Sequence, residues 1–194
     1  KKTDEGPNPV RFVFPKIELR LYIRDPKNMI THHTWIWNVL NITDEPQDRV
    51  SYFIDGDVPK DFAQLNVTIK DEKNKKLKIL SVDANKPNYK QFVVKLNRPI
   101  KPFQKRRLLK LEYDWEEPER HFSYNLASDC KKFMYLLTVP KGIEIKPRVL
   151  KVDPATKYKT YASPESEIKY LKDRTEVRWQ AINLRAYESY RFEW

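Results

Sequence analysis

Histidine and aspartate are the residues of this sequence whose types and spacing could support acid–base chemistry. His32 and His33 are adjacent, His121 stands alone, and Asp55 and Asp57 flank a glycine. An imidazole held against a carboxylate can move protons in a hydrolase, so a hydrolase that uses one of these histidines with Asp55 or Asp57 is one hypothesis. On a strand, His32 and His33 would point to opposite faces and could not share a metal without a bulge. The Asp-Gly-Asp triplet is more typical of a β-turn than of a calcium site.

Local signatures of catalysis and cofactor binding are absent from the sequence. Phosphate-binding loops need clustered glycines, and the three glycines, Gly6, Gly56 and Gly142, lie far apart. The patterns GxSxG, HExxH and CxxC do not occur. The single cysteine, Cys130, cannot form an intrachain disulfide or a cysteine-rich zinc site. We therefore expect a non-enzymatic protein without a cofactor, although a catalytic site built from residues distant in sequence leaves no such local signature.

Basic residues give a second functional hypothesis. The chain has a net charge of +11, and five basic residues cluster with no acid between them: Lys101, Lys105, Arg106, Arg107 and Lys110. Such patches bind nucleic acid or other polyanions through counterion release. The acids between Glu112 and Glu119 and the excess of Lys over Arg favour a solvated surface instead. A polyanion-binding domain centred on Lys105, Arg106 and Arg107 is therefore the alternative function.

The stretch from Thr34 to Ile42 is the strand around which these residues must be arranged. Alternation places Trp35, Trp37 and Val39 on one face. The opposite face carries three aliphatic residues: Ile36, Leu40 and Ile42. Because strands of antiparallel sheets usually bury one face only, this pattern predicts a central strand that is covered on both sides. The two tryptophans are expected to be core residues rather than a stacking platform for sugars or bases.

Strand-like segments with alternating polarity continue along the whole chain. Turn signals fall every eight to twelve residues or so, and no segment has a sustained helical period with caps. This spacing predicts an all-β fold, an antiparallel sandwich of about twelve strands. We expect a linker-like segment at residues 1–9 and one domain at residues 10–194. Two small sandwiches at residues 10–116 and 120–194 are the alternative, because a Pro- and Glu-rich stretch separates them.

The approach to the last strand resembles a known structural motif. Leu184-Arg185-Ala186-Tyr187-Glu188-Ser189-Tyr190 is similar to the tyrosine corner of immunoglobulin-like and fibronectin type III-like sandwiches. In that motif a tyrosine hydroxyl bonds back to the backbone. The Gly or Pro usual in the loop is absent here. The resemblance covers about ten residues and implies an immunoglobulin-like fold, with nothing about activity.

These observations together predict an interaction or ligand-sensing module of a larger protein. A sandwich buries one face of each sheet, so the face with Ile36, Leu40 and Ile42 needs a further layer, which another domain or protein chain would supply. The chain opens without Met and in linker-like composition. The lone cysteine favours a cytoplasmic setting, and the abundance of Lys, Glu and Pro with little Gly is typical of thermophilic prokaryotes. No apolar run reaches the ~18 residues of a membrane span.

Overall fold

The structure, a computed structural model, describes residues 11–104 and 107–194. The predicted all-β class is confirmed, and these residues form fourteen strands in three sheets. The one helical turn among these residues is the 3₁₀ turn η1 (Phe62–Leu65). The strands are β1 (Phe12–Asp25), β2 (Ile30–Asn41), β3 (Gln47–Asp55), β4 (Thr68–Asp71), β5 (Lys78–Lys86), β6 (Tyr89–Ile100), β7 (Arg107–Glu116), β8 (His121–Asn125), β9 (Cys130–Pro140), β10 (Arg148–Val152), β11 (Lys159–Tyr161), β12 (Glu167–Tyr170), β13 (Arg174–Leu184) and β14 (Ser189–Glu193).

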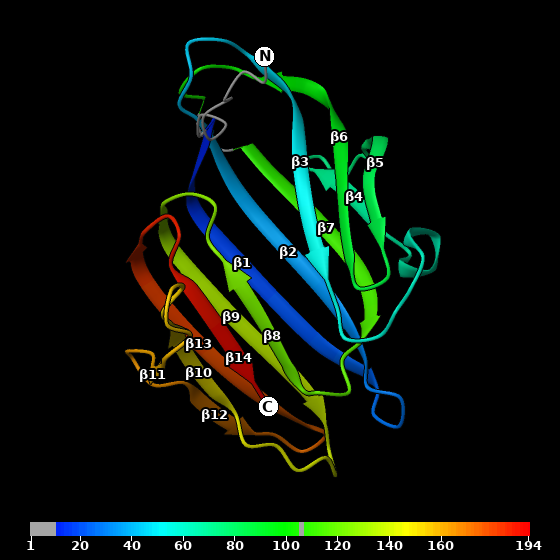
Figure 1. Cartoon of the computed structure of the whole chain (residues 1–194), viewed down its shortest axis with the longest axis vertical. Helices are drawn as coiled ribbons and strands as arrows, with labels where there is room; N and C mark the ends of the chain where they lie inside the picture. The colour runs from blue at the N-terminus through cyan, green and yellow to red at the C-terminus, as the bar shows by residue number, and fades with distance from the viewer. Residues whose placement is uncertain (1–10, 105–106) are drawn as a thin grey trace.

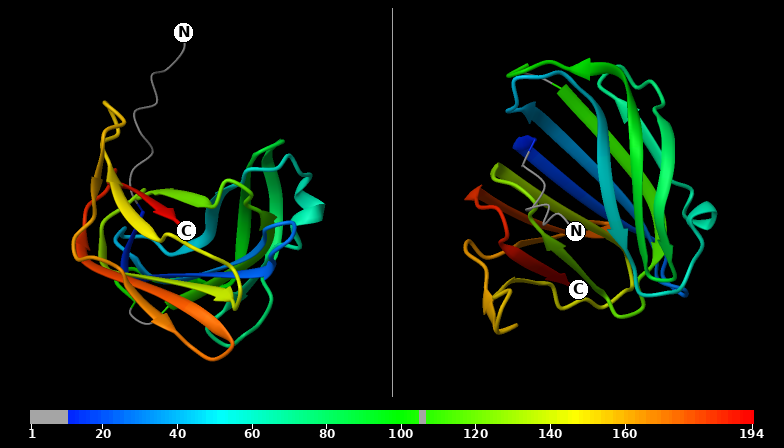
Figure 2. Two further views of the ribbon diagram at one scale, coloured as in Figure 1. Left: turned by 90° about the horizontal axis from the view of Figure 1, so that it is seen from below. Right: turned by 45° about the horizontal axis from the view of Figure 1, so that its top comes forward.

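A seven-stranded sheet of order β12-β13-β9-β1-β2-β7-β4 forms the base of the molecule. Two smaller sheets, β3-β6-β5 and β11-β10-β14-β8, lie side by side over one face of it (Figures 1 and 2). The base contains strands from both sides of the Glu116–Arg120 stretch. The architecture differs from the two-sheet immunoglobulin plan, because there are three sheets and β1 pairs with β9 in parallel.

The tyrosine-corner resemblance does not extend to the hydrogen bond that defines that motif. Tyr190 is buried, but its hydroxyl bonds to the carboxylate of Glu188 at 3.1 Å, two residues away. The hydroxyl has no backbone carbonyl among its hydrogen-bond partners in the described structure. The local sequence similarity therefore correctly indicates the start of the last strand, β14. It does not predict the hydrogen bond of a tyrosine corner.

Strand β2 has the central position that its pattern predicts, between β1 and β7. Its two tryptophans contact different small sheets. The Trp37 ring stacks on Tyr52 of β3 at 4.6 Å, whereas the Trp35 ring lies 4.7 Å from the ring of Tyr124 on β8. Trp35 is 4% exposed, so it belongs to the core, while Trp37 is half-buried. Strand β2 therefore runs beneath the line where the two small sheets approach each other.

Candidate functional site

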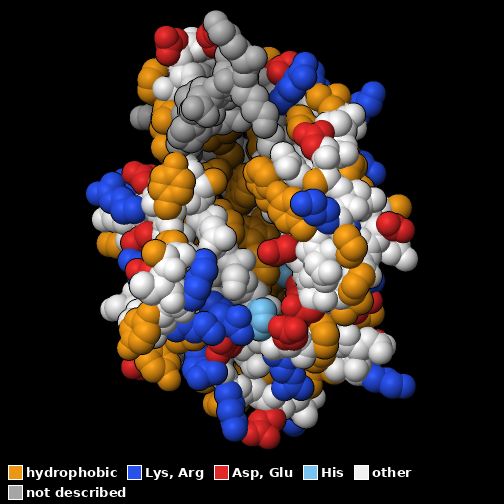
Figure 3. All heavy atoms as spheres, viewed as in Figure 1, with side chains coloured by type: hydrophobic (Ala, Val, Ile, Leu, Met, Phe, Trp, Pro, Cys, Tyr) orange, Lys and Arg blue, Asp and Glu red, His pale blue; other side chains and the backbone are white. Residues whose placement is uncertain are grey.

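A groove of about 860 Å³ runs between the two small sheets, with β2 and β7 as its floor. Figure 3 shows this face of the molecule, with hydrophobic side chains in the hollow and His, Asp and Glu side chains at its lower end. Aromatic and aliphatic residues of the base form the floor: Trp35, Trp37, Leu111 and Tyr113. Phe122 and Tyr124 of β8 line one side, and Val50 and Ile54 of β3 line the other. The floor and the two sides of the groove are thus mainly apolar.

Each rim of the groove is an edge strand, β3 on one side and β8 on the other. The Gly56 N–H donates to the carbonyl of Asn88, so every second residue of β3 counted back from Gly56 bonds to β6. The peptide groups of Arg49, Ser51 and Phe53 therefore face the groove. By the same argument, the bond from the Leu126 N–H to the Glu188 carbonyl turns the peptide group of Ser123 on β8 toward the groove.

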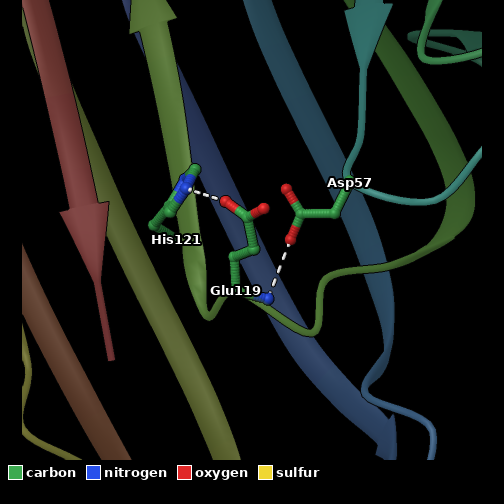
Figure 4. A group of neighbouring side chains, drawn as sticks. All are labelled: Asp57, Glu119 and His121. Atoms are coloured by element: carbon green, nitrogen blue, oxygen red, sulfur yellow. Dashed lines mark hydrogen bonds and ion pairs between the residues drawn. The ribbon is translucent and has the colours of Figure 1, made fainter.

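The lower end of the groove is a cluster of two acids and a histidine, Asp57, Glu119 and His121 (Figure 4). Asp57 lies two residues beyond the end of β3, Glu119 lies in the turn before β8, and His121 begins β8. The Glu119 N–H donates to Asp57 Oδ2 at 3.0 Å, and His121 Nε2 lies 2.8 Å from Glu119 Oε2. One potential ligand atom from each side chain lies within 4.8 Å of the other two. The cluster joins the rims where they converge.

A buried acid and a buried histidine lie beneath this cluster. Glu117 is 1% exposed and His33 is fully buried, with Glu117 Oε1 3.2 Å from His33 Nε2. Neither of these atoms has a well-oriented hydrogen bond, although Glu117 Oε2 accepts the Asp57 N–H at 3.3 Å. Burial raises the pKa of Glu117 to about 9 and lowers the pKa of His33 to about 3. Burial therefore disfavours the charged form of both side chains.

The structure separates the three histidines of the hydrolase hypothesis. His33 is in the core, where its ring stacks on Tyr113 at 4.6 Å. His32 points away from the groove and pairs with Asp114 at 2.7 Å. Of the three histidines, only His121 lies beside the Asp55–Asp57 turn at the end of the groove.

Burial raises the pKa of the Cys130 thiol to about 11, so this cysteine stays protonated.

The five basic residues predicted to bind polyanions do not form one exposed patch among the described residues. Lys105 and Arg106 lie outside the described residues. Lys101 is exposed, and Lys110 forms an ion pair with Glu112 at 2.9 Å. Arg107 is 3% exposed, and its guanidinium donates to the carbonyls of Arg98 and Pro99 at 3.0–3.2 Å and to Glu72 at 3.3 Å. Arg107 therefore acts within the fold, and polyanion binding by its neighbours stays a prediction.

Replacing Arg107 by alanine is expected to lower the free energy of unfolding by about 1–3 kcal/mol, because two backbone carbonyls and the Glu72 carboxylate lose the donor that the buried guanidinium supplies. Urea unfolding of the variant measures this loss. The same change at exposed Lys101 should alter stability by less than about 0.5 kcal/mol. Equal stability of Arg107→Ala and the native protein would contradict the internal role.

The apolar residues predicted to meet a partner lie on the outer face of the base. Ile36 and Leu40 are half-buried and Ile42 is 37% exposed. Ile36 has charged cross-strand neighbours, Glu18 and Lys110. A partner on this face stays a prediction.

Sequence reasoning missed Glu117 and Glu119. In the sequence these residues indicate a break between strands and charges that dilute a basic surface. The available signal was the spacing of Glu119 and His121, which places both side chains on one side of an extended segment. Nothing in the sequence connects that pair to Asp57, 62 residues earlier.

Comparison with known proteins identifies a similar fold and no family. No family model and no curated protein matches the chain. An M1 zinc metallopeptidase from Deinococcus radiodurans matches with a TM-score of 0.55 and 11% identity, over 94% of this chain and 42% of that one. Mutant forms bound to a Tyr-Ser-Ala substrate and to L-arginine match equally. At this identity the likeness shows the fold alone, a β-sandwich similar to part of these enzymes, and the chain spans less than half of their length.

Proposed function

We propose that this chain is a non-enzymatic interaction module of a larger protein, and that its groove holds an extended peptide segment paired with β3. The observation that carries this proposal is the open edge of β3 above an aromatic floor. Unpaired N–H and C=O groups on an edge strand are a template for another strand. Strand addition obtains affinity from main-chain hydrogen bonds and specificity from pockets for alternate side chains. The groove offers both on one surface.

The β3 rim is the better template of the two. It has nine residues, whereas β8 has five. A strand laid against β3 would place alternate side chains on Trp37 and on neighbouring floor residues of β7. Natural edge strands are commonly protected by proline, bulges or a covering loop. Between Arg49 and Asp55, β3 contains no proline and its register with β6 is regular.

The size of the chain relative to the similar structures supports the larger-protein part of the proposal. The chain corresponds to 42% of the matched metallopeptidase chain, so the likeness is to one region of a longer protein. An intracellular prokaryotic setting stays a prediction. The described residues contain no helix that is long and apolar enough to cross a bilayer.

A proline at position 51 tests the proposal. Because the Ser51 N–H faces the groove and not β6, Ser51→Pro should leave the fold intact while removing a donor and blocking the edge. We expect peptides selected from a random phage-displayed library on the native protein to bind the variant about tenfold or more weakly, measured by fluorescence anisotropy.

The same substitution on the opposite rim, Ser123→Pro, is the matched control and should leave affinity nearly unchanged. Circular dichroism of both variants verifies that they fold. A library that yields no specific peptide, or peptides that bind Ser51→Pro as tightly as the native protein, would refute strand addition at β3.

A further inference from the structure

We propose that Asp57, Glu119 and His121 bind a divalent transition cation of the zinc class at the lower end of the groove. This inference rests on side-chain geometry and is independent of peptide binding. Zinc ligands lie about 2.0–2.2 Å from the metal, which separates the ligand atoms of one tetrahedral ion by roughly 3.4 Å. The three candidate atoms already lie within 4.8 Å of one another. Small side-chain rotations would bring them to ligand distance, and the three side chains point toward one another (Figure 4).

The buried carboxyl of Glu117 is a second observation that favours a cation here. Its side chain points at the Asp57 turn, where Oε2 accepts the Asp57 N–H at 3.3 Å. Its other oxygen, Oε1, is buried and without a hydrogen-bond partner. A buried unpaired polar atom is costly and rare in native proteins. A cation bound to Asp57 would place positive charge beside this group and compensate for its burial.

The charges around the cluster are unusual for this chain. The net charge is +11, yet no Lys or Arg in the described parts of the chain forms an ion pair with Asp57, Glu117 or Glu119. Glu117 and Glu119 instead contact histidines, at 3.2 Å for Glu117 and His33 and at 2.8 Å for Glu119 and His121. Asp57, Glu117 and Glu119 thus lie close together without a Lys or Arg ion pair among the described residues, which favours binding of a metal cation.

His32 provides a comparison within the same molecule. It also has two carboxylates nearby, with Asp114 at 2.7 Å and Glu112 at 3.6 Å. There, however, Arg24 lies 3.0 Å from Asp114 and Lys110 lies 2.9 Å from Glu112. Cationic side chains already neutralise that group. The two clusters have the same ligand types, but among the described residues no Lys or Arg is ion-paired to the carboxylates of the cluster at the groove.

The donor set favours zinc over magnesium or calcium. Ca²⁺ and Mg²⁺ prefer oxygen ligands throughout, whereas one imidazole nitrogen with two carboxylate oxygens suits zinc and its first-row neighbours. Three protein ligands leave a fourth position for water. Because Asp57 follows β3 and the other two ligands flank the start of β8, the ion would join the two small sheets. Zinc would therefore stabilise the folded protein by mass action.

Titration of the EDTA-treated chain with ZnCl₂ in a calorimeter tests the site. We expect one equivalent of zinc to bind and the thermal midpoint to rise. His121→Ala should weaken zinc binding by about tenfold or more, since even loss of a group that only orients a metal ligand costs roughly 10–100-fold. His32→Ala is the matched control and should bind zinc like the native protein. MgCl₂ and CaCl₂ in excess should not displace the zinc.

Asp57→Asn is a second, conservative variant that is expected to fold, because the new amide oxygen can still accept the Glu119 N–H. The substitution removes the anionic ligand. A folded Asp57→Asn variant, verified by circular dichroism, that fails to bind zinc supports the site. The site is overturned if the native protein shows no zinc binding. It is also overturned if folded His121→Ala and Asp57→Asn variants bind zinc as tightly as the native protein, or if His32→Ala loses binding instead.

Discussion

Gly56→Ala is expected to lower the free energy of unfolding by about 3 kcal/mol, the upper end of the usual cost of overpacking. A Cβ at position 56 would lie 2.3–2.4 Å from three ring atoms of Trp115. Trp115 is fully buried, and its Nε1 donates to the carbonyl of Val58 at 2.7 Å. The ring cannot move away without losing this bond and the packing around it. Urea unfolding followed by tryptophan fluorescence measures the difference.

Gly142→Ala is the matched control, because nothing lies within 4 Å of its Cβ position. Its positive φ of 92° still makes alanine unfavourable there, at a cost of about 1 kcal/mol. A loss at position 56 no larger than the loss at position 142 would show that Trp115 accommodates the methyl group. Gly56 also precedes the proposed ligand Asp57, so the variant should bind zinc more weakly than the Gly142→Ala control.

The central position of β2 within the base could be predicted from its two apolar faces. The predicted cover on both faces is not seen in the described structure, because the small sheets lie over one face and Ile36, Leu40 and Ile42 lie on the other (Figure 2). The all-β class followed from strand-length alternation and closely spaced turns. Both properties depend on residues close together in the chain, where side-chain periodicity reports burial directly. The boundaries of β2, Ile30 to Asn41, extend a few residues beyond the predicted core of the strand at its start.

The division into three sheets could not be predicted in this way. Alternation shows that a segment is a strand, but not which strand it pairs with. The parallel pairing of Ile17 with Phe133 joins residues more than a hundred positions apart, and no local pattern specifies it. The same limit applies to the cluster in the groove, because Asp57 and Glu119 meet only through the placement of β3 and β8 over the base.

Arg107 shows a different reason for failure. Basic residues are mostly exposed, so a basic run is reasonably interpreted as a charged surface. At this position the side chain instead lies in the core, where its five N–H donors can satisfy the carbonyls at the end of β6 and the carboxylate of Glu72. Composition and net charge describe the surface on average and cannot identify the one arginine with a structural role.

Phe192→Ala is expected to lower the free energy of unfolding by about 3–5 kcal/mol, the range measured for buried Phe truncations. Phe192 of β14 is fully buried, and its ring lies 4.4 Å from Tyr135, 5.8 Å from Trp179 and 5.9 Å from Phe133. These three residues belong to β9 and β13 of the base. The Phe192 ring therefore contributes to holding the four-stranded sheet on the base, and its removal leaves a cavity between two layers.

A fall of on the order of 10 °C in the thermal midpoint should accompany this loss, at about 2–4 °C per kcal/mol for a chain of this size. Phe53→Ala, at a side chain that is 58% exposed, should change stability by less than about 0.5 kcal/mol. Hydrogen exchange distinguishes a local from a uniform effect. Because the cavity lies under β14, amides of β8, β10 and β14 should lose protection before those of β3 and β6. Simultaneous loss of amide protection in both small sheets would contradict a local effect. It would show that the two sheets unfold as one unit despite the groove between them.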